Sequence, residues 1–210
     1  MNFKYWKLLK TALTFSIMMF VLCGLAYPLL VTGISQLILP AKANGNLVYV
    51  DGSAVGSQLV GQQFDKEIFM KSRPSAVNYN VYTAQEKADG KYTGVASGST
   101  NYAPTNPKLV ERLQADLDSF LAANPTAQKG SIPADLLTAS GSGLDPHISV
   151  QSAAIQIPAL AKNTGLSAET LDKIVRENTQ GKLLGVFGEP TVNVLGVNIA
   201  IAKALKNTGE

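Results

Sequence analysis

Cysteine and histidine each occur only once in this 210-residue chain. The cysteine, Cys23, lies in an apolar segment, so the rest of the chain has no disulfide framework and no thiol chemistry. With His147 as the only histidine, the sequence offers no zinc ligand set. A phosphate-binding loop and a complete dinucleotide fingerprint are also missing. We therefore expect no metal site, no cofactor of the chain's own and no enzymatic activity.

Acidic residues are absent from the first part of the chain, where Lys4, Lys7, Lys10 and Lys42 lie. The formal net charge of +3 arises there, because the remainder has fourteen basic residues against fifteen acidic ones, a net charge of −1. Nucleic-acid binding needs Lys and Arg clustered on the folded domain. We therefore expect no nucleic-acid partner.

Residues 11–39 carry no charge and are mostly apolar. A helix needs about 20 such residues to cross a bilayer, so the run predicts a transmembrane helix with its core at about 11–31. Residues 1–10 then form a short N-terminus, and residues 40–210 form one soluble domain. The alternative is a cleaved signal peptide ending near Ala41-Lys42-Ala43, but its apolar stretch would be only about 7 to 15 residues long.

The orientation of this helix follows from the lysines that precede it, because short loops rich in Lys and Arg stay in the cytoplasm. We expect a single-pass protein of a bacterial cell membrane with a cytoplasmic N-terminus and an extracytoplasmic domain. Pro28 lies within the span and is expected to kink it, since proline removes one helical hydrogen bond.

The domain begins with a predicted strand at 47–50, the hairpin turn Asp51-Gly52 and a partner strand at 54–60. Residues 71–106 show little periodicity and are predicted to form a long loop, which is often functional in a compact domain. Asn106 and Pro107 are expected to start a helix that ends at Asn124-Pro125. Its apolar stripe is predicted to consist of Leu109, Val110, Leu113, Leu117, Phe120 and Leu121.

Further helices are predicted from serine caps at Ser149 and Ser167, over about 150–163 and 168–178, with Pro158 dividing the first. A glycine-rich stretch leads to residues 192–195 and a last helix near 197–205. Strands and helices alternate too loosely for a doubly wound sheet. The sequence therefore predicts a small α/β or α+β domain with a short sheet, anchored by one N-terminal transmembrane helix.

The tetrapeptide Ala-Ser-Gly-Ser occurs twice, at residues 96–99 and 139–142. Its glycines either present backbone N–H groups as an anion-binding nest or form two tight turns, and the turns are favoured. His147 lies near Ser140 and Asp145, but the glycine-x-serine-x-glycine elbow of hydrolases is incomplete. Arg73 is expected either to bind carbonyl groups and hold its loop or to reach a carboxylate of a partner.

Taken together, the motifs resemble those of the C subunit of the bacterial Kdp potassium-transporting ATPase over essentially the whole chain. The most specific is the string Thr-Ala-Ser-Gly-Ser-Gly-Leu-Asp-Pro-His-Ile-Ser at 138–149. The other matching positions are 56–62, Phe69, 73–76, Ser97, Gly98, Asn101, 104–106, 184–185, 188–190, 192–195 and Asn198.

The resemblance implies a complex with a channel-like potassium-conducting subunit, a P-type subunit that hydrolyses ATP and a small membrane peptide. Within it, this chain is expected to aid assembly and to raise the ATP affinity of the P-type subunit, while the complex binds ATP and potassium. The resemblance implies nucleotide contact at Ser97, Gly98 and Asn101. Assembly contacts are expected at Arg73, Ser140, Gly141, Asp145 and His147.

Two observations argue against a direct nucleotide contact. Ser99 replaces a glycine of the family pattern, and the charge distribution places the loop outside the membrane, away from cytoplasmic ATP. An effect on ATP affinity would then pass through other subunits by differential binding to their conformations. Two other functions stay open, an anchored extracytoplasmic hydrolase and a solute-binding module.

Overall fold

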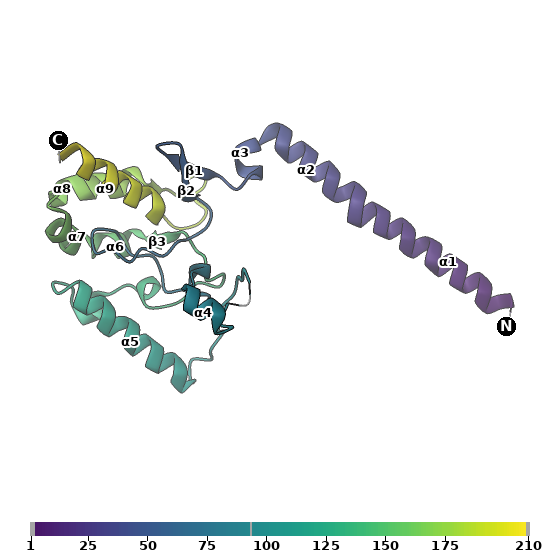
Figure 1. The fold of residues 1–210 in the computed structure, drawn as a ribbon, viewed down its shortest axis with the longest axis horizontal. Helices are drawn as coiled ribbons and strands as arrows, with labels where there is room; N and C mark the ends of the chain where they lie inside the picture. Colours follow the sequence, from purple (N-terminus) through teal and green to yellow (C-terminus); the bar gives the residue numbers. More distant parts are fainter. Residues whose placement is uncertain (1–2, 93, 209–210) are drawn as a thin grey trace. The chain divides into compact units, whose positions relative to one another are not determined.

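The computed structural model describes residues 3–92 and 94–208 and divides into two units, Met1–Leu47 and Val48–Glu210. The first unit is one continuous helix followed by a short turn (Figure 1). It consists of α1 (Phe3–Phe20), the π-helical turn η1 (Val21–Ala26), α2 (Tyr27–Ile38) and α3 (Pro40–Ala43). Residues Lys4–Ile38 are apolar enough and, at about 1.5 Å per residue, more than long enough to cross a membrane.

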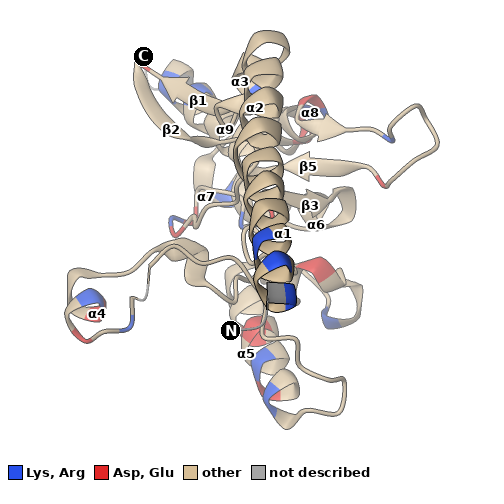
Figure 2. Ribbon diagram, turned by 90° about the vertical axis from the view of Figure 1, so that its right-hand side faces the viewer, with Lys and Arg blue, Asp and Glu red and all other residues tan. Residues whose placement is uncertain are grey.

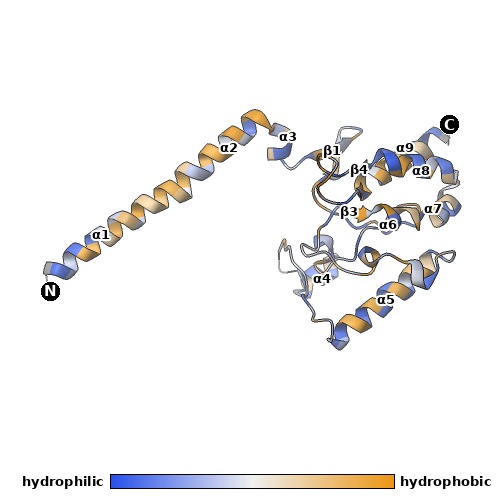
Figure 3. Cartoon of the chain, turned by 180° about the vertical axis from the view of Figure 1, so that it is seen from behind, coloured by the Kyte–Doolittle hydropathy of each residue, from blue (hydrophilic) through white to orange (hydrophobic). Residues whose placement is uncertain are grey.

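Most residues of this long helix are apolar (Figure 3). Near Pro28 the helix departs from regular α-helical geometry in the π-helical turn η1, which ends two residues before the proline. Proline has no N–H to donate to the carbonyl four residues earlier, and its ring collides with that carbonyl in a regular α-helix. A π-turn widens the helix at this place, as is typical of such single-turn bulges.

The described residues from Leu47 onward form two small sheets. One is the hairpin of β1 (Leu47–Val50) and β2 (Ser53–Ser57), and both turn residues, Asp51 and Gly52, have the positive φ of a type I′ turn. The partner strand β2 ends at Ser57, three residues earlier than the predicted strand at 54–60. The other sheet has the order β3 (His147–Ser149), β5 (Thr191–Asn193) and β4 (Thr179–Gln180). Its register pairs His147 with Asn193.

Helices surround this second sheet, and most of them begin at a side-chain cap. The serine caps at Ser149 and Ser167 are confirmed by hydrogen bonds from the backbone N–H groups three residues later. Asn193 accepts a similar bond from Gly196, so the last helix starts earlier than predicted. The helices are α6 (Val150–Ala154), α7 (Ile157–Thr164), α8 (Ala168–Glu177) and α9 (Val194–Thr208).

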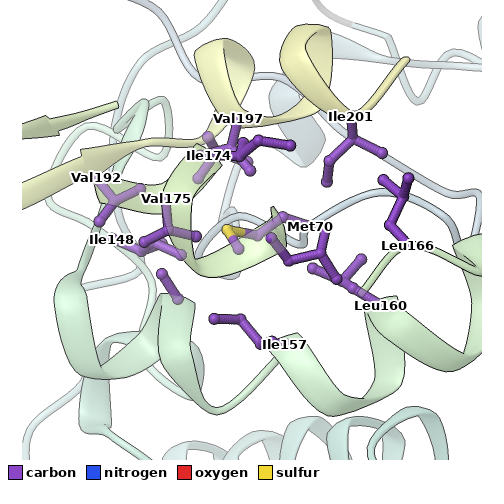
Figure 4. Packing of buried hydrophobic residues seen from close by; sticks show 13 residues of the cluster. Met70, Ile148, Ile157, Leu160, Leu166, Ile174, Val175, Val192, Val197 and Ile201 are labelled. Atoms are coloured by element: carbon purple, nitrogen blue, oxygen red, sulfur yellow. The ribbon is translucent and has the colours of Figure 1, made fainter. Parts of the chain in front are cut away.

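The main core lies between these four helices and the three-stranded sheet (Figure 4). Met70 is fully buried at its centre although it belongs to a loop. Asn198 accepts from the Met70 N–H at 2.7 Å and donates to the Met70 carbonyl at 3.0 Å, and Gln156 binds the backbone of Lys71 in the same way. Two buried amide side chains thus satisfy the loop backbone that enters the core.

Helix α5 (Pro107–Ala123) lies apart from this core and buries Leu117 and Phe120. Its predicted N-cap is confirmed, because Asn106 accepts from the Lys108 N–H at 3.0 Å. The predicted stripe was wrong at Val110, which is 60% exposed.

The long 71–106 segment also contains an unpredicted helix, α4 (Ala84–Ala88), with a capping box between Thr83 and Glu86. The remaining short helices are η2 (Asn78–Asn80), η3 (Lys129–Ser131) and η4 (Ala134–Leu136). The fold is the predicted mixture of helices with short sheets, preceded by one apolar helix.

Candidate functional site

The two loops with identical tetrapeptides meet in the folded domain. The Gly98 N–H donates to the Ser142 carbonyl at 2.7 Å, and the Ser97 hydroxyl donates to the same oxygen at 3.1 Å. Residues predicted for nucleotide contact therefore adjoin residues predicted for assembly. We call the contact between residues 73–79, 97–98 and 138–149 the loop junction.

Gly143 occupies the closest approach within the loop junction. Its φ is +66°, and a Cβ at this position would lie 2.7 Å from the Gly98 carbonyl oxygen and 2.8 Å from Val77 Cγ2. Only glycine meets both conditions without strain. Gly141, two residues earlier, is exposed and has open space around it. One glycine thus closes the junction, whereas the other faces outward.

The geometry does not support the anion-binding nest, and it shows a turn at only one of the two tetrapeptides: the Gly143 N–H donates to the Ser140 carbonyl at 3.2 Å, whereas residues 96–99 form neither a turn nor a bend. Neither Gly98 nor Gly141 has a positive φ, and the N–H of Gly98 already donates within the chain. Asn101 has a φ of +50° and is exposed, outside the contact of the two loops. The three residues predicted for nucleotide contact are therefore not gathered into one backbone cradle.

Arg73 links two parts of the loop junction. Its Nη1 lies 3.1 Å from Asp145 Oδ2, and its Nε and Nη2 each donate to the Thr138 carbonyl at 3.4 Å. The Arg73 and Asp145 side chains are only 23% and 29% exposed, so water screens this pair less than a surface pair. Of the two predicted roles, holding the loop is the one that these bonds show.

Ser75 and Tyr79 also hold the junction, and neither was among the predicted site residues. The Ser75 hydroxyl donates to the Gly143 carbonyl at 2.6 Å and accepts from the Tyr79 N–H at 3.0 Å. The Tyr79 hydroxyl donates to the Arg73 carbonyl at 2.5 Å, and burial raises the pKa of this phenol. Tyr79 has a φ of +48°, a conformation that local sequence does not predict.

His147 is fixed by groups on both sides of its ring. Its Nδ1 lies 3.7 Å from Asp145 Oδ1, which also accepts from the His147 N–H at 2.9 Å. Its Nε2 lies 3.4 Å from Asn193 Nδ2 on β5. Ser140 is buried, and its hydroxyl faces that of Ser142 at 3.4 Å. The described contacts thus do not assemble a serine, histidine and aspartate into a triad.

Asp135 secures the end of the 138–149 segment, and no sequence pattern pointed to it. One carboxylate oxygen accepts from the Ser149 N–H at 2.7 Å, and the other accepts from the Ser152 hydroxyl at 2.6 Å. Because Ser149 also caps α6, this carboxylate fixes the junction to the start of that helix.

Two charged groups beside the junction have shifted pKa values. The Lys71 ammonium donates to the carbonyls of Phe64 and Asp65 at 2.5 and 2.7 Å, and burial lowers its pKa. Burial raises the pKa of Asp116 on α5, and Arg112 opposes this shift. The Arg112 Nε and Asp116 Oδ2 atoms are buried and 4.0 Å apart, without a hydrogen-bond partner among the described residues.

A hollow of about 450 Å³ lies elsewhere on the domain, between the β1–β2 hairpin, the 62–69 segment and α9. Phe64, Phe69 and Ile199 contribute apolar lining, and the ion pair of Asp51 with Lys206 at 2.7 Å lies at the same place. No predicted site residue lines it. Its volume falls within the range of small-molecule sites.

Comparison with known proteins identifies the family. Residues 9–203 match the family model described as KdpC, the c chain of K+-transporting ATPase. The chain belongs to the KdpC family. A KdpC subunit of a potassium-transporting ATPase from Clostridium kluyveri is 61% identical over 96% of this chain and 96% of its own length. The KdpC subunit from Clostridioides difficile is 54% identical over 95% of this chain and 98% of its own length. The KdpC subunit from Caldanaerobacter subterraneus is 42% identical over 94% of this chain and 96% of its own length.

Proposed function

We propose that this chain is a non-catalytic accessory subunit of an ATP-driven potassium-uptake complex. The observation that carries the proposal is the family match over residues 9–203, because it includes both the apolar helix and the domain. The partners would be the channel-like potassium-conducting subunit, the P-type ATP-hydrolysing subunit and the small membrane peptide. ATP and potassium would be bound by the complex rather than by this chain alone.

The proposed orientation puts the N-terminus in the cytoplasm and the domain outside. It rests on Lys4, Lys7 and Lys10, which precede the apolar helix without any acidic residue among them. Protease added to intact spheroplasts should digest the domain. Full protection of the domain, with digestion only after lysis, would reverse the orientation.

The loop junction is the proposed docking surface of the domain. Its interior is held by Arg73, Asp145 and Gly143, so the exposed Gly141 is presented on a backbone with little freedom to move. A preorganised loop loses less conformational entropy on binding than a flexible one. This rigidity supports a role in protein–protein contact.

The proposed role in the complex is to raise the ATP affinity of the P-type subunit from outside the membrane. Binding that differs between two conformations of the complex is sufficient for such coupling. The test compares the KM for ATP of complexes purified with and without this chain. The proposal expects a higher KM for ATP without it, and an equal KM would contradict the role.

Direct nucleotide binding is tested separately on the isolated domain, residues 44–210. Calorimetry should show no ATP binding in the micromolar range, which would correspond to about −8 kcal/mol. A micromolar dissociation constant that is lost in a Gly98→Val variant would favour contact at the loop junction instead.

Solute binding is a second candidate function, favoured only by the hollow beside α9. Its volume of about 450 Å³ and its apolar lining suit a small molecule. If this function is correct, the isolated domain should retain a small molecule through purification, and Ile199→Trp should displace it. Native mass spectrometry distinguishes the two outcomes.

A further inference from the structure

The loop between β4 and β5 exposes four large apolar side chains at its tip. Leu183, Leu184, Val186 and Phe187 are between 64% and 83% exposed. Figure 2 shows this loop reaching away from the body of the domain, with charged positions only at its base. Contiguous exposed apolar groups of this kind mark interaction sites.

The backbone of the tip is closed by hydrogen bonds of its own. Leu183 and Phe187 exchange two backbone hydrogen bonds of 2.8 and 3.0 Å across the loop. Leu184 and Gly185 have φ values of +54° and +75°. Leucine is unfavourable at a left-handed position, where Asn or Gly costs less, and it is also unfavourable in water. A contact outside the chain would offset both costs.

The charges around the tip indicate the chemistry of the contact. Lys182 and Glu189 flank the loop and lie 3.7 Å from each other, and no charged residue occurs between them. Lys182 is therefore the only basic residue of the loop and is paired with Glu189, and the loop has no Trp or Tyr, the residues typical of a membrane interface. A neutral tip closed by its own backbone hydrogen bonds fits an uncharged apolar pocket of a protein.

We infer that residues 183–187 insert into an apolar pocket on another subunit of the same membrane complex. This inference rests on the proposed function, since it requires that the chain assembles with other subunits. It adds a second point of attachment, formed by different residues from the loop junction. A small number of anchor residues of this kind typically supplies most of the affinity of an interface.

The test places the photo-crosslinker p-benzoylphenylalanine at Phe187 of the full-length chain, expressed with the other subunits in native membranes. The same replacement at Val110, an exposed apolar residue of α5, is the matched control. We expect an adduct with another subunit from position 187 and much less from position 110. Adducts only with lipid, only with a second copy of this chain, or equally from both positions would overturn the inference.

A second measurement uses Leu184→Asn together with Phe187→Ser, since Asn tolerates the left-handed φ at position 184. We expect the yield of co-purified subunits to fall about tenfold, as for loss of an interface hot spot, while Val110→Ser keeps it. An unchanged yield for the double variant overturns the inference but leaves the proposed function intact. Failure of the parental chain to co-purify would instead contradict the proposed function.

Discussion

The guanidinium of Arg73 lies 3.1 Å from the carboxylate of Asp145, although the two residues are 72 positions apart in the chain. The same guanidinium also binds the carbonyl of Thr138. Asp145 in turn accepts from the N–H of His147. Two motifs that are distant in the sequence are thus parts of one polar network, so a change at either residue affects the shape of the junction.

Arg73→Ala should destabilise the domain by about 1–2 kcal/mol, because it leaves a partly buried carboxylate without its charged partner. Urea denaturation followed by circular dichroism measures the change. The matched control is Arg176→Ala, which breaks the exposed pair with Asp172 and should cost about 0.5 kcal/mol or less. Equal losses from both variants would show that the Arg73 pair is only a surface pair.

Gly143→Ala should cost about 2–4 kcal/mol, since a methyl group meets the Gly98 carbonyl and Val77 at a positive φ. Gly141→Ala should change the stability by less than about 0.5 kcal/mol, because its surroundings are open. The denaturation midpoints of the two variants test the assignment. Similar midpoints would mean that the two loops do not pack as closely as the structure has them.

Asp116→Asn should stabilise the domain at pH 7, by up to about 1 kcal/mol. Burial raises the pKa of Asp116 in the folded chain, so folding favours the protonated carboxyl. That favourable contribution is fully present below the ordinary pKa of 3.8 and is lost as the pH rises through the folded pKa. The stability gained by Asp116→Asn at pH 7 should therefore disappear in acid.

Thermal unfolding from pH 3 to pH 7 measures this dependence. Asp118→Asn, an exposed change on the same helix, controls for removal of one negative charge. A gain in thermal stability from Asp116→Asn that is equal at all pH values would contradict the role of burial.

Gly141→Arg should leave the domain folded but reduce assembly, because it places a large charged side chain on the outward face of the loop junction. A tenfold loss of complex would correspond to about 1.4 kcal/mol. Gly130→Arg is the matched control, since Gly130 is exposed with open space on η3. If both variants assemble like the parent, the loop junction is a turn of the fold and not a docking surface.

Local structure was predicted well where a short pattern has one physical cause. Asn106, Ser149 and Ser167 cap helices as expected, and Asp51-Gly52 forms the hairpin turn. Helix α4 was also predictable, because Thr83 and Glu86 have the spacing of a capping box inside the presumed loop.

The candidate site was predictable only as separate motifs. The contact of Gly98 with Ser142 joins segments 44 residues apart in sequence, and no local pattern encodes such a pairing. Tyr79 and Asp135 were missed for the same reason, since their roles depend on groups that reach them only after folding. Residue type indicated the chemistry of Arg73, but not which carbonyl and carboxylate it binds.

We expect this KdpC-family chain to work as a subunit of a membrane-embedded potassium-transporting ATPase. The most direct measurement is purification of the tagged full-length chain from native membranes in a mild detergent. We predict co-elution of the two large subunits and an ATPase activity that potassium stimulates. Elution of the chain alone, from membranes that contain those subunits, would contradict the claim.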